Sequence, residues 1–508
     1  MREKTEELKR RKAEAAKMGG AEAVERQHRE GKLTARERID LLFEPGSFVE
    51  FGALADHENR NPQMAGKHTP ADGVITGYGN VHGKTVFCAA YDFTVMAGSM
   101  GEVGERKVKR MRELALRLRA PIVWLLDSSG ARIQESAGSQ FAGSGDLFFE
   151  QVIMSGVVPQ VAAVMGPCAA GTAYIPALAD VAFMVKGTSS MALGGPHLVK
   201  AAVGEEISAE ELGGSRIHNT ISGCADLESP DDAACIEAVK EYLSYLIEPL
   251  LPTADSPERE VEALYDLVPA EPNKVYDMKK VIGAIADDGK FFELKPGWGR
   301  SVITAFARLN GRSVGIVASQ PSFRGGVLDV DSADKAARFV TLCDAYDVPL
   351  VFLVDVPGFL IGSKVEQQGI IRHGAKMLYA VSEATVPKMT VVLRKAYGAG
   401  YFVMCGRTYE TDQILAWPTA EISVMGPEGA AAIIFRKEIE AAPDPAAVRA
   451  ERVAMIREVI NPYVAAGGAH VDDVIDPAAT RRLLVRGLEA ARGKRVERPQ
   501  RKHGIWPV

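Results

Sequence analysis

Stretches of fully apolar residues alternate along the chain with stretches that are apolar on one helical face only. Residues 120–126 and 348–354 are continuously apolar, and each run is followed by an aspartate, Asp127 or Asp355. A helical spacing of apolar residues precedes each run: Val108, Met111, Ala115 and Leu118 before the first; Ala336, Phe339, Cys343 and Tyr346 before the second. Apolar strands alternating with amphipathic helices predict an α/β fold with mostly parallel sheets covered on both faces.

The second half of the chain repeats the first. Residues 120–130 resemble residues 348–358, an offset of 228, and the same offset aligns 82–86 with 310–314 and 158–161 with 386–389. Such an ungapped register indicates a tandem duplication. Proline and acidic residues cluster where the halves meet, so we expect domains at 1–256 and 257–508.

The repeat is shifted near its start. Residues 46–50 resemble residues 289–293 at an offset of 243, so the first half holds 15 additional residues. We expect this insertion in the polar stretch around 56–62. The charged outer arms, 1–40 and 481–508, are expected to be helical or extended and to pack on a neighbouring subunit.

Small residues follow the second apolar strand of each half, at 166–174 and 394–402. The offset places Ala170 opposite Gly398 and Gly171 opposite Ala399. A turn of small residues that opens a helix exposes successive backbone N–H groups to an anion or oxyanion. The alternative is close packing of helix on strand; two equivalent turns favour a pair of oxyanion holes for acyl chemistry.

Composition and charge exclude several classes of protein. The 508 residues are 47% hydrophobic and carry a net charge of −6, which argues against a disordered chain and against nucleic-acid binding. The longest apolar runs fall short of about 18 residues and the first twenty residues are highly charged, so we expect neither a membrane span nor a secretory signal. The six cysteines form no CxxC pair, which favours a reducing, cytoplasmic location (the mitochondrial matrix for a processed eukaryotic chain) and no metal.

Familiar catalytic motifs are missing from the sequence. There is no GxSxG elbow, no Walker A motif, no HExxH and no carboxylate pair. We interpret His373 as a helix-surface or interface residue, and Asp127 and Asp355 as caps of the turns that follow them. These absences fit a reaction that depends on oxyanion stabilisation, with the base supplied by a substrate or cofactor.

Several motifs resemble one family. These are Asp127-Ser-Ser-Gly-Ala-Arg-Ile-Gln-Glu135, Gly166-Pro-Cys-Ala-Ala-Gly171, Ile370-Ile-Arg-His-Gly-Ala-Lys-Met377, Trp417-Pro-Thr-Ala-Glu-Ile-Ser-Val-Met-Gly426 and Gly31-Lys-Leu-Thr-Ala-Arg-Glu-Arg38. They resemble the carboxyltransferase (β) subunit of biotin-dependent acyl-CoA carboxylases, in the propionyl-CoA/methylcrotonyl-CoA branch, over nearly the whole chain.

The resemblance implies two crotonase-like (ClpP/crotonase ββα-superhelix) domains in a homohexamer, with each active site between halves of different subunits. Acyl-CoA would lie on the first half, with the thioester oxygen at Ala170 and Gly171. Biotin would enter from the second half and be held at Ala399 and Gly400. The family also implies cofactor contact at Gly398 and substrate contacts at Gly130, Ala131, Arg132 and Phe402, with Arg132 as a candidate for a phosphate contact.

The same resemblance implies the partners. The chain contains no Ala-Met-Lys-Met biotinylation motif and no ATP-grasp signature. Biotin and the biotin carboxylase would therefore be carried by a separate (α) subunit, while CoA thioesters are substrates. Neither nucleic acid nor a membrane is an expected partner.

Some positions depart from the family pattern. Phe402 replaces the aspartate of propionyl-CoA-type enzymes, Ala170 replaces a glycine, and the motifs mix two branches. A propionyl-CoA-like or acetyl-CoA-like substrate is slightly favoured. Two alternatives remain: the carboxyltransferase subunit of a sodium-pumping biotin-dependent decarboxylase, and a non-catalytic acyl-CoA-binding paralogue.

Overall fold

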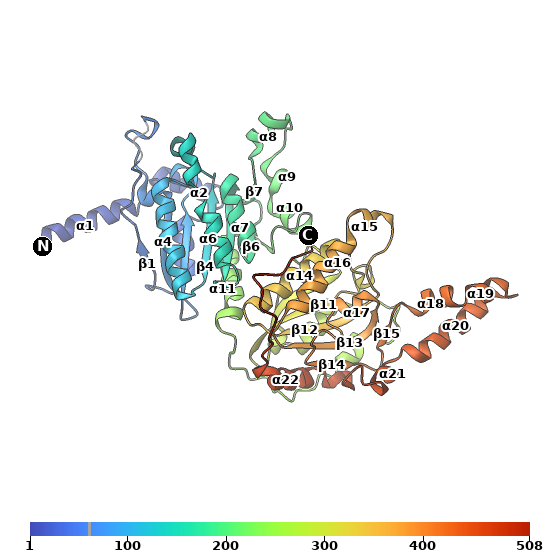
Figure 1. The fold of residues 1–508 in the computed structure, drawn as a ribbon. Helices are drawn as coiled ribbons and strands as arrows, with labels where there is room; N and C mark the ends of the chain where they lie inside the picture. Colours follow the sequence, from blue (N-terminus) through green and yellow to red (C-terminus); the bar gives the residue numbers. More distant parts are fainter. Residues whose placement is uncertain (59–61, 508) are drawn as a thin grey trace. The chain divides into compact units, whose positions relative to one another are not determined.

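The computed structural model describes residues 1–58 and 62–507, and these form two compact units. Unit 1 is Met1–Ile247 and unit 2 is Glu248–Val508. Figure 1 shows the elements of each unit coloured along the chain. This division lies nine residues before the domain boundary expected at 256/257, which stays a prediction.

Unit 1 is built on an eight-stranded sheet with the order β1-β2-β3-β4-β5-β6-β8, and β7 pairs with β5 beyond that path. Its strands are β1 (Val49–Phe51), β2 (Val74–Val81), β3 (Lys84–Tyr91), β4 (Ile122–Ser128), β5 (Gln160–Ala169), β6 (Val181–Val185), β7 (Ser190–Ala192) and β8 (Leu227–Ser229). Its helices are α1 (Arg2–Ala15), α2 (Ala21–Arg29), α3 (Ala35–Leu42), α4 (Glu102–Leu118), α5 (Ile133–Ser136), α6 (Asp146–Met154), α7 (Tyr174–Leu178), α8 (Pro196–Val203), α9 (Ala209–Gly213), α10 (Ser215–Thr220) and α11 (Asp232–Ile247). Short 3-10 segments are η1 (Pro62–Met64), η2 (Pro70–Gly73), η3 (Met96–Gly98), η4 (Ser139–Gly143) and η5 (Ala170–Ala173).

Unit 2 repeats this topology with the order β9-β10-β11-β12-β13-β14-β16, and β15 pairs with β13. Its strands are β9 (Phe291–Leu294), β10 (Val302–Leu309), β11 (Arg312–Ser319), β12 (Leu350–Val356), β13 (Lys388–Tyr397), β14 (Gln413–Ala416), β15 (Glu421–Ser423) and β16 (Asp473–Val474). Its helices are α12 (Leu264–Leu267), α13 (Met278–Ile285), α14 (Val330–Ala345), α15 (Ser363–Gln367), α16 (Ile370–Glu383), α17 (Ala399–Val403), α18 (Pro427–Ile434), α19 (Arg436–Ala441), α20 (Pro445–Ile460), α21 (Pro462–Gly467) and α22 (Thr480–Ala490), with 3-10 segments η6 (Asp287–Gly289), η7 (Arg324–Gly326), η8 (Pro477–Ala479) and η9 (Ala491–Gly493).

Strand register confirms the duplication. Ile122 pairs with Gln160 between β4 and β5, and Leu350 pairs with Lys388 between β12 and β13, so both pairs keep the 228 offset. Twenty-two residues separate β1 from β2, against seven between β9 and β10. The 15 additional residues therefore lie where they were expected, although the middle of that stretch, 59–61, falls outside the described residues.

Helices cover both faces of each sheet. In unit 1, α4 packs on β2 and β3 from one side, while α3 and α11 pack from the other. The apolar face predicted for α4 is buried except at its last member, Leu118, which is exposed because the helix ends there. In unit 2 the corresponding face of α14 is buried through Cys343, but Tyr346 lies one residue past the helix and is only half-buried.

The N-terminal arm is helical, as expected, through α1, α2 and α3. Its last helix, α3, begins with a capping box in which Thr34 accepts from the Glu37 N–H and Glu37 accepts from the Thr34 N–H. In the part of the chain that the structure describes, no helix has the length and apolar character needed to cross a bilayer. Five of the six free cysteines are buried, whereas Cys224 is exposed.

Candidate active site

The turn after β5 is the candidate oxyanion hole of unit 1. Strand β5 continues to Ala169, four residues beyond the apolar run seen in the sequence, and the chain then enters η5 at Ala170. Ala170 has φ +53°, a left-handed conformation that costs a side-chain-bearing residue about 1 kcal/mol. The Thr172 hydroxyl donates to the Ala169 carbonyl (2.7 Å), and this hydrogen bond fixes the turn. Because Ala170 and Gly171 are the first residues of the helical segment, no helical carbonyl precedes them to accept from their N–H groups.

The turn after β13 has the same form in unit 2. Gly398 has φ +56° and ψ −140°, a backbone conformation that only glycine adopts readily, and its N–H donates to the Ser423 carbonyl at 2.9 Å. Helix α17 then begins at Ala399, which is exposed, while Gly400 is buried. A Cβ at Gly400 would lie 3.0 Å from the Val356 side chain, so this residue must be small for α17 to approach β12.

Glycines at the ends of the neighbouring strands let the backbone approach each turn. A Cβ at Gly130, which follows β4, would lie 2.8 Å from the Ala169 carbonyl oxygen and 3.2 Å from the Ala170 Cβ. In unit 2, a Cβ built at Gly400 would lie 3.2 Å from the Cα of Gly358. The structure therefore brings Gly130 against the Ala170 turn and Gly358 against the Gly400 turn.

Ala131 and Arg132 have structural contacts. Ala131 forms a bridge with Met100, and the Arg132 N–H donates to the Met100 carbonyl at 3.0 Å. The Arg132 guanidinium is 1% exposed and donates to Asp72 (2.5 Å) and Glu135 (2.9 Å). A guanidinium that is buried and paired with two carboxylates directs no donor to a ligand, and this pairing argues against the phosphate contact expected of Arg132.

Asp127 is buried and pairs with cationic side chains, and it is not the turn cap that we expected. Its carboxylate accepts from Gln27 Nε2 (2.7 Å), Arg38 Nη1 (3.1 Å) and Lys32 Nζ (3.4 Å). All four side chains are almost completely buried. The partners come from α2, α3 and the link between them, about a hundred residues earlier in the chain, so turn chemistry could not reveal them.

Asp355, the equivalent residue of unit 2, is also not the turn cap that we expected. It pairs with an arginine from its own sheet. Arg394, on the adjacent strand β13, lies 2.8 Å from it (Nη2–Oδ2). The residue equivalent to Arg394 in unit 1 is Gly166, where a Cβ would lie only 1.9 Å from Asp127 Oδ1. Absence of a side chain at Gly166 thus leaves room for the cations of the N-terminal arm to reach Asp127.

Among the residues that the structure describes, the side chains near the two turns offer neither a nucleophile nor an unpaired histidine base. Burial raises the pKa of the Cys168 thiol, two residues before Ala170, to about 12, which keeps it protonated and inert. His373 is half-buried and its Nδ1 lies 2.8 Å from Asp334 Oδ1 on α14. Charge stabilisation by backbone N–H groups is the chemistry that these turns can perform.

An apolar wall lies beside the Gly171 turn, and no motif in the sequence indicated it. A Cβ at Gly171 would lie 3.3 Å from Met100 Cε and 3.7 Å from Phe148 Cζ. The Phe148 ring packs edge-on against Tyr174, with centroids 5.6 Å apart. Tyr174 is equivalent to Phe402 under the 228 offset, and the two aromatic side chains are similarly exposed, 47% and 44%. Applying the offset to Phe402 would have found Tyr174.

Phe402 lies on α17 directly after the unit 2 turn. Its ring centroid is 5.8 Å from that of Tyr401 and 6.2 Å from that of Tyr409. Phe402 therefore presents an aromatic surface beside Gly400, with no charge.

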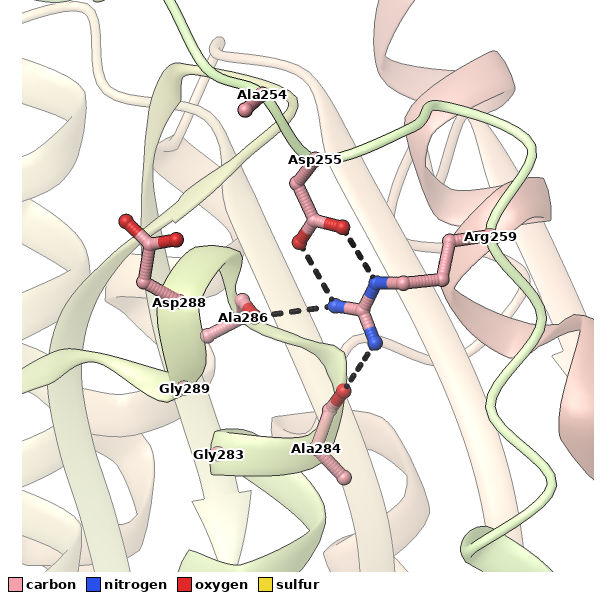
Figure 2. Close-up of a pocket in the computed structure, with 8 residues that line it drawn as sticks. All are labelled: Ala254, Asp255, Arg259, Gly283, Ala284, Ala286, Asp288 and Gly289. Carbon is pink, nitrogen blue, oxygen red and sulfur yellow. Dashed lines mark hydrogen bonds and ion pairs between the residues drawn. The ribbon is translucent and has the colours of Figure 1, made fainter.

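A hollow of about 410 Å³ in unit 2 lies among residues of a different region. Figure 2 shows its lining, with the Arg259 guanidinium between Asp255 and two backbone carbonyls. Arg259 donates to both oxygens of Asp255 (2.6 and 2.9 Å) and to the Ala284 and Ala286 carbonyls. Because Arg259 is fully paired within the protein, we assign this hollow a structural role in unit 2 and do not include it in the candidate active site.

Comparison with known proteins places this geometry in a family. Residues 26–506 match the carboxyl transferase domain. The chain is 46% identical to the methylmalonyl-CoA decarboxylase subunit alpha of Propionigenium modestum, over 99% of both chains, and 45% identical to the propionyl-CoA carboxylase carboxyltransferase subunit of Haloferax mediterranei, over 100% of both. A crystal structure of the transcarboxylase 12S hexamer with methylmalonyl-CoA and methylmalonic acid bound is 48% identical, with a TM-score of 0.96 over 100% of this chain and 98% of that one. The match confirms the crotonase-like α/β duplication, and the chain belongs to the carboxyl transferase family.

Proposed function

We propose that this protein is the carboxyltransferase subunit of a biotin-dependent enzyme and moves a carboxyl group between biotin on a partner subunit and the α-carbon of an acyl-CoA. The observation that carries the proposal is the pair of equivalent turns at Ala170–Gly171 and Gly398–Gly400, in a chain of the carboxyl transferase family. The names of its relatives favour the propionyl-CoA/methylmalonyl-CoA pair as substrate and product.

Each turn has one task in this proposal. The N–H groups of Ala170 and Gly171 hold the thioester oxygen and stabilise the negative charge that develops on it when the α-proton leaves. The N–H groups of Ala399 and Gly400 hold the carbonyl oxygen of biotin; the exposure of Ala399 and the absence of side-chain bulk at Gly398 suit a ring approaching the backbone. Carboxybiotin, when bound, supplies both the carboxyl group and the basic nitrogen, which agrees with the lack of a side-chain base at either turn.

Transfer itself is the property to test. The chain is mixed with a biotinylated carrier protein and a malonyl-type CoA labelled in its free carboxyl group, and label on the carrier is counted. We expect transfer that depends on both components. Gly171→Pro, which deletes one N–H, should lower the rate by about 100-fold to 1000-fold. Unchanged transfer by this variant would refute the assignment of the hole.

A second candidate is the same half-reaction running toward decarboxylation. One relative is named a methylmalonyl-CoA decarboxylase subunit and another a propionyl-CoA carboxylase subunit, at almost equal identity. The complete enzyme discriminates between them: ATP-dependent bicarbonate incorporation supports the carboxylase, and sodium-dependent CO₂ release supports the decarboxylase. Binding of acyl-CoA without any transfer would support the non-catalytic paralogue that Ala170 and Phe402 suggested.

We also propose that the chain assembles as a homohexamer that binds a separate biotin-carrying subunit, in the cytoplasm. The related 12S structure is titled a hexamer, and free, mostly buried cysteines suit a reducing compartment. Six copies of a 54.6 kDa chain give a particle of about 330 kDa, which light scattering coupled to size exclusion can measure. A monomeric or dimeric particle would refute this assembly.

A further inference from the structure

We propose that Met100 and Phe148 form the wall that contacts the acyl chain of the substrate and limits it to a short, apolar group. The inference rests on the proposed function, because it places the thioester at the Ala170–Gly171 turn. It adds the feature of unit 1 that selects among acyl-CoAs.

The wall lies directly against the turn. Met100 Cε and Phe148 Cζ are the heavy atoms nearest to a Cβ built at Gly171, at 3.3 and 3.7 Å, and Tyr174 extends the same surface through its edge contact with Phe148. An acyl chain attached to a carbonyl held at this turn has its first carbons within van der Waals range of that surface. On the side of the turn that Met100 and Phe148 cover, a single methyl group built at Gly171 already comes within 3.3 Å of Met100.

Two hydrogen bonds hold the backbone of Met100 in place. Its N–H donates to the Gly130 carbonyl at 2.9 Å, and its carbonyl accepts from the Arg132 N–H at 3.0 Å. The buried ion pairs of Arg132 with Asp72 and Glu135 fix that partner in turn. The thioether beyond this anchor has three flexible torsions, so the wall is fixed in position and adaptable at its tip.

Unit 2 has no such wall at the equivalent positions. The counterpart of Met100 is Leu328, which is completely buried, whereas Met100 is partly exposed. The counterpart of Phe148 is Lys376, whose Nζ lies 3.3 Å from Asp334 Oδ2. The Met100–Phe148 surface is therefore particular to unit 1, the unit in which the proposed function places the acyl-CoA.

Truncation of the wall tests the inference. Met100→Ala and Phe148→Leu are assayed for carboxyl transfer with propionyl-CoA and hexanoyl-CoA. Leu118→Ala, which shortens an exposed apolar side chain at the end of α4, serves as the matched control. We expect each wall variant to raise the ratio of kcat/KM for hexanoyl-CoA over propionyl-CoA by at least about tenfold, since a single methylene in an apolar pocket is worth about 10-fold to 200-fold. The control should keep the wild-type ratio.

A direct binding measurement separates this inference from the proposed function. Isothermal titration of the same proteins with both acyl-CoAs and with free CoA needs no turnover. A raised affinity ratio of hexanoyl-CoA over propionyl-CoA in the wall variants, with unchanged affinity for free CoA, supports the wall even if the wild type proves inactive in transfer. Ratios within twofold of wild type for both variants, in binding and in turnover, overturn it.

Discussion

The buried carboxylate of Asp127 should hold the N-terminal arm (residues 1–40) against the sheet of unit 1, and Asp127→Asn tests this. The substitution keeps the shape of the side chain and removes its charge. Arg38 and Lys32 then remain buried without the anion that they share, at 3.1 and 3.4 Å. Arg38 keeps one ion pair, with Asp232 at 2.7 Å, so the arm is loosened and not released completely.

The magnitude follows from these distances. At an effective dielectric constant of about 20, each of the two attractions amounts to about 5 kcal/mol. Water that reaches the uncovered cations returns part of this energy, and the removal of one partner from a buried ion pair generally costs about 3 to 5 kcal/mol. We expect a loss of that size in the free energy of unfolding of unit 1.

Hydrogen exchange and limited trypsin digestion measure the two consequences. Amide exchange in β4 should accelerate in Asp127→Asn while exchange in β12 stays unchanged, and trypsin should cleave within the first forty residues more rapidly. Asp355→Asn is the matched control, because it breaks the ion pair with Arg394 inside unit 2 and leaves the arm protected. Wild-type exchange in β4 together with wild-type cleavage of the arm would refute the reasoning.

Four further outcomes are expected. Gly166→Ala would place a Cβ 1.9 Å from Asp127 Oδ1 and push this carboxylate away from its cations. We therefore expect the free energy of unfolding to fall by at least about 3 kcal/mol, and an unchanged urea midpoint would contradict this. Ala170→Gly should stabilise the protein by up to about 1 kcal/mol by relieving the left-handed strain and should keep carboxyl transfer, since the N–H remains; loss of transfer would count against the backbone role. Burial raises the pKa of the half-buried Glu105 from 4.5 to about 7, so the folded state holds this proton more tightly and the contribution of Glu105 to stability falls as the pH rises from 4.5 to 7. Glu105→Gln should remove this contribution and raise the free energy of unfolding by about 2 kcal/mol at pH 8 relative to pH 4.5; the same difference between the two proteins at both pH values would disprove it. Phe402→Asp should change the ratio of kcat/KM between two acyl-CoAs by about tenfold, and an unchanged ratio would remove Phe402 from the specificity argument.

The two units solve one electrostatic problem in different ways. Each has an aspartate at the end of its central strand, in a position where water is excluded, and each therefore needs a cation. Unit 2 supplies Arg394 from the neighbouring strand. Unit 1 has Gly166 there and receives its cations from Arg38 on α3 and from Lys32 in the link between α2 and α3. The motif at residues 31–38 is thus explained as the part of the arm that packs on the sheet of unit 1 and pairs with Asp127.

Several features of the fold could be predicted from the sequence because they depend on local pattern. The apolar runs and helical spacings gave the central strands and the two covering helices, and the 228 offset gave the shared topology of the sheets. Errors occurred at the ends of elements. Leu118 and Tyr346 were placed on buried helix faces, but each lies where its helix terminates, and β5 and β13 each continue past the apolar run because ladder pairing, and not hydrophobicity, holds their last residues.

The sequence by itself determined the duplication, the two small-residue turns and the family, since all three are written in residue order and spacing. Tertiary structure alone decided which side chains meet: it buried Arg132 between two carboxylates, brought Arg38 to Asp127, and set Met100 and Phe148 beside Gly171. The reason is physical. Spacing along the chain fixes which residues share a strand or helix face, whereas contacts between residues a hundred positions apart depend on how those faces pack and on which charges must be paired once water is excluded.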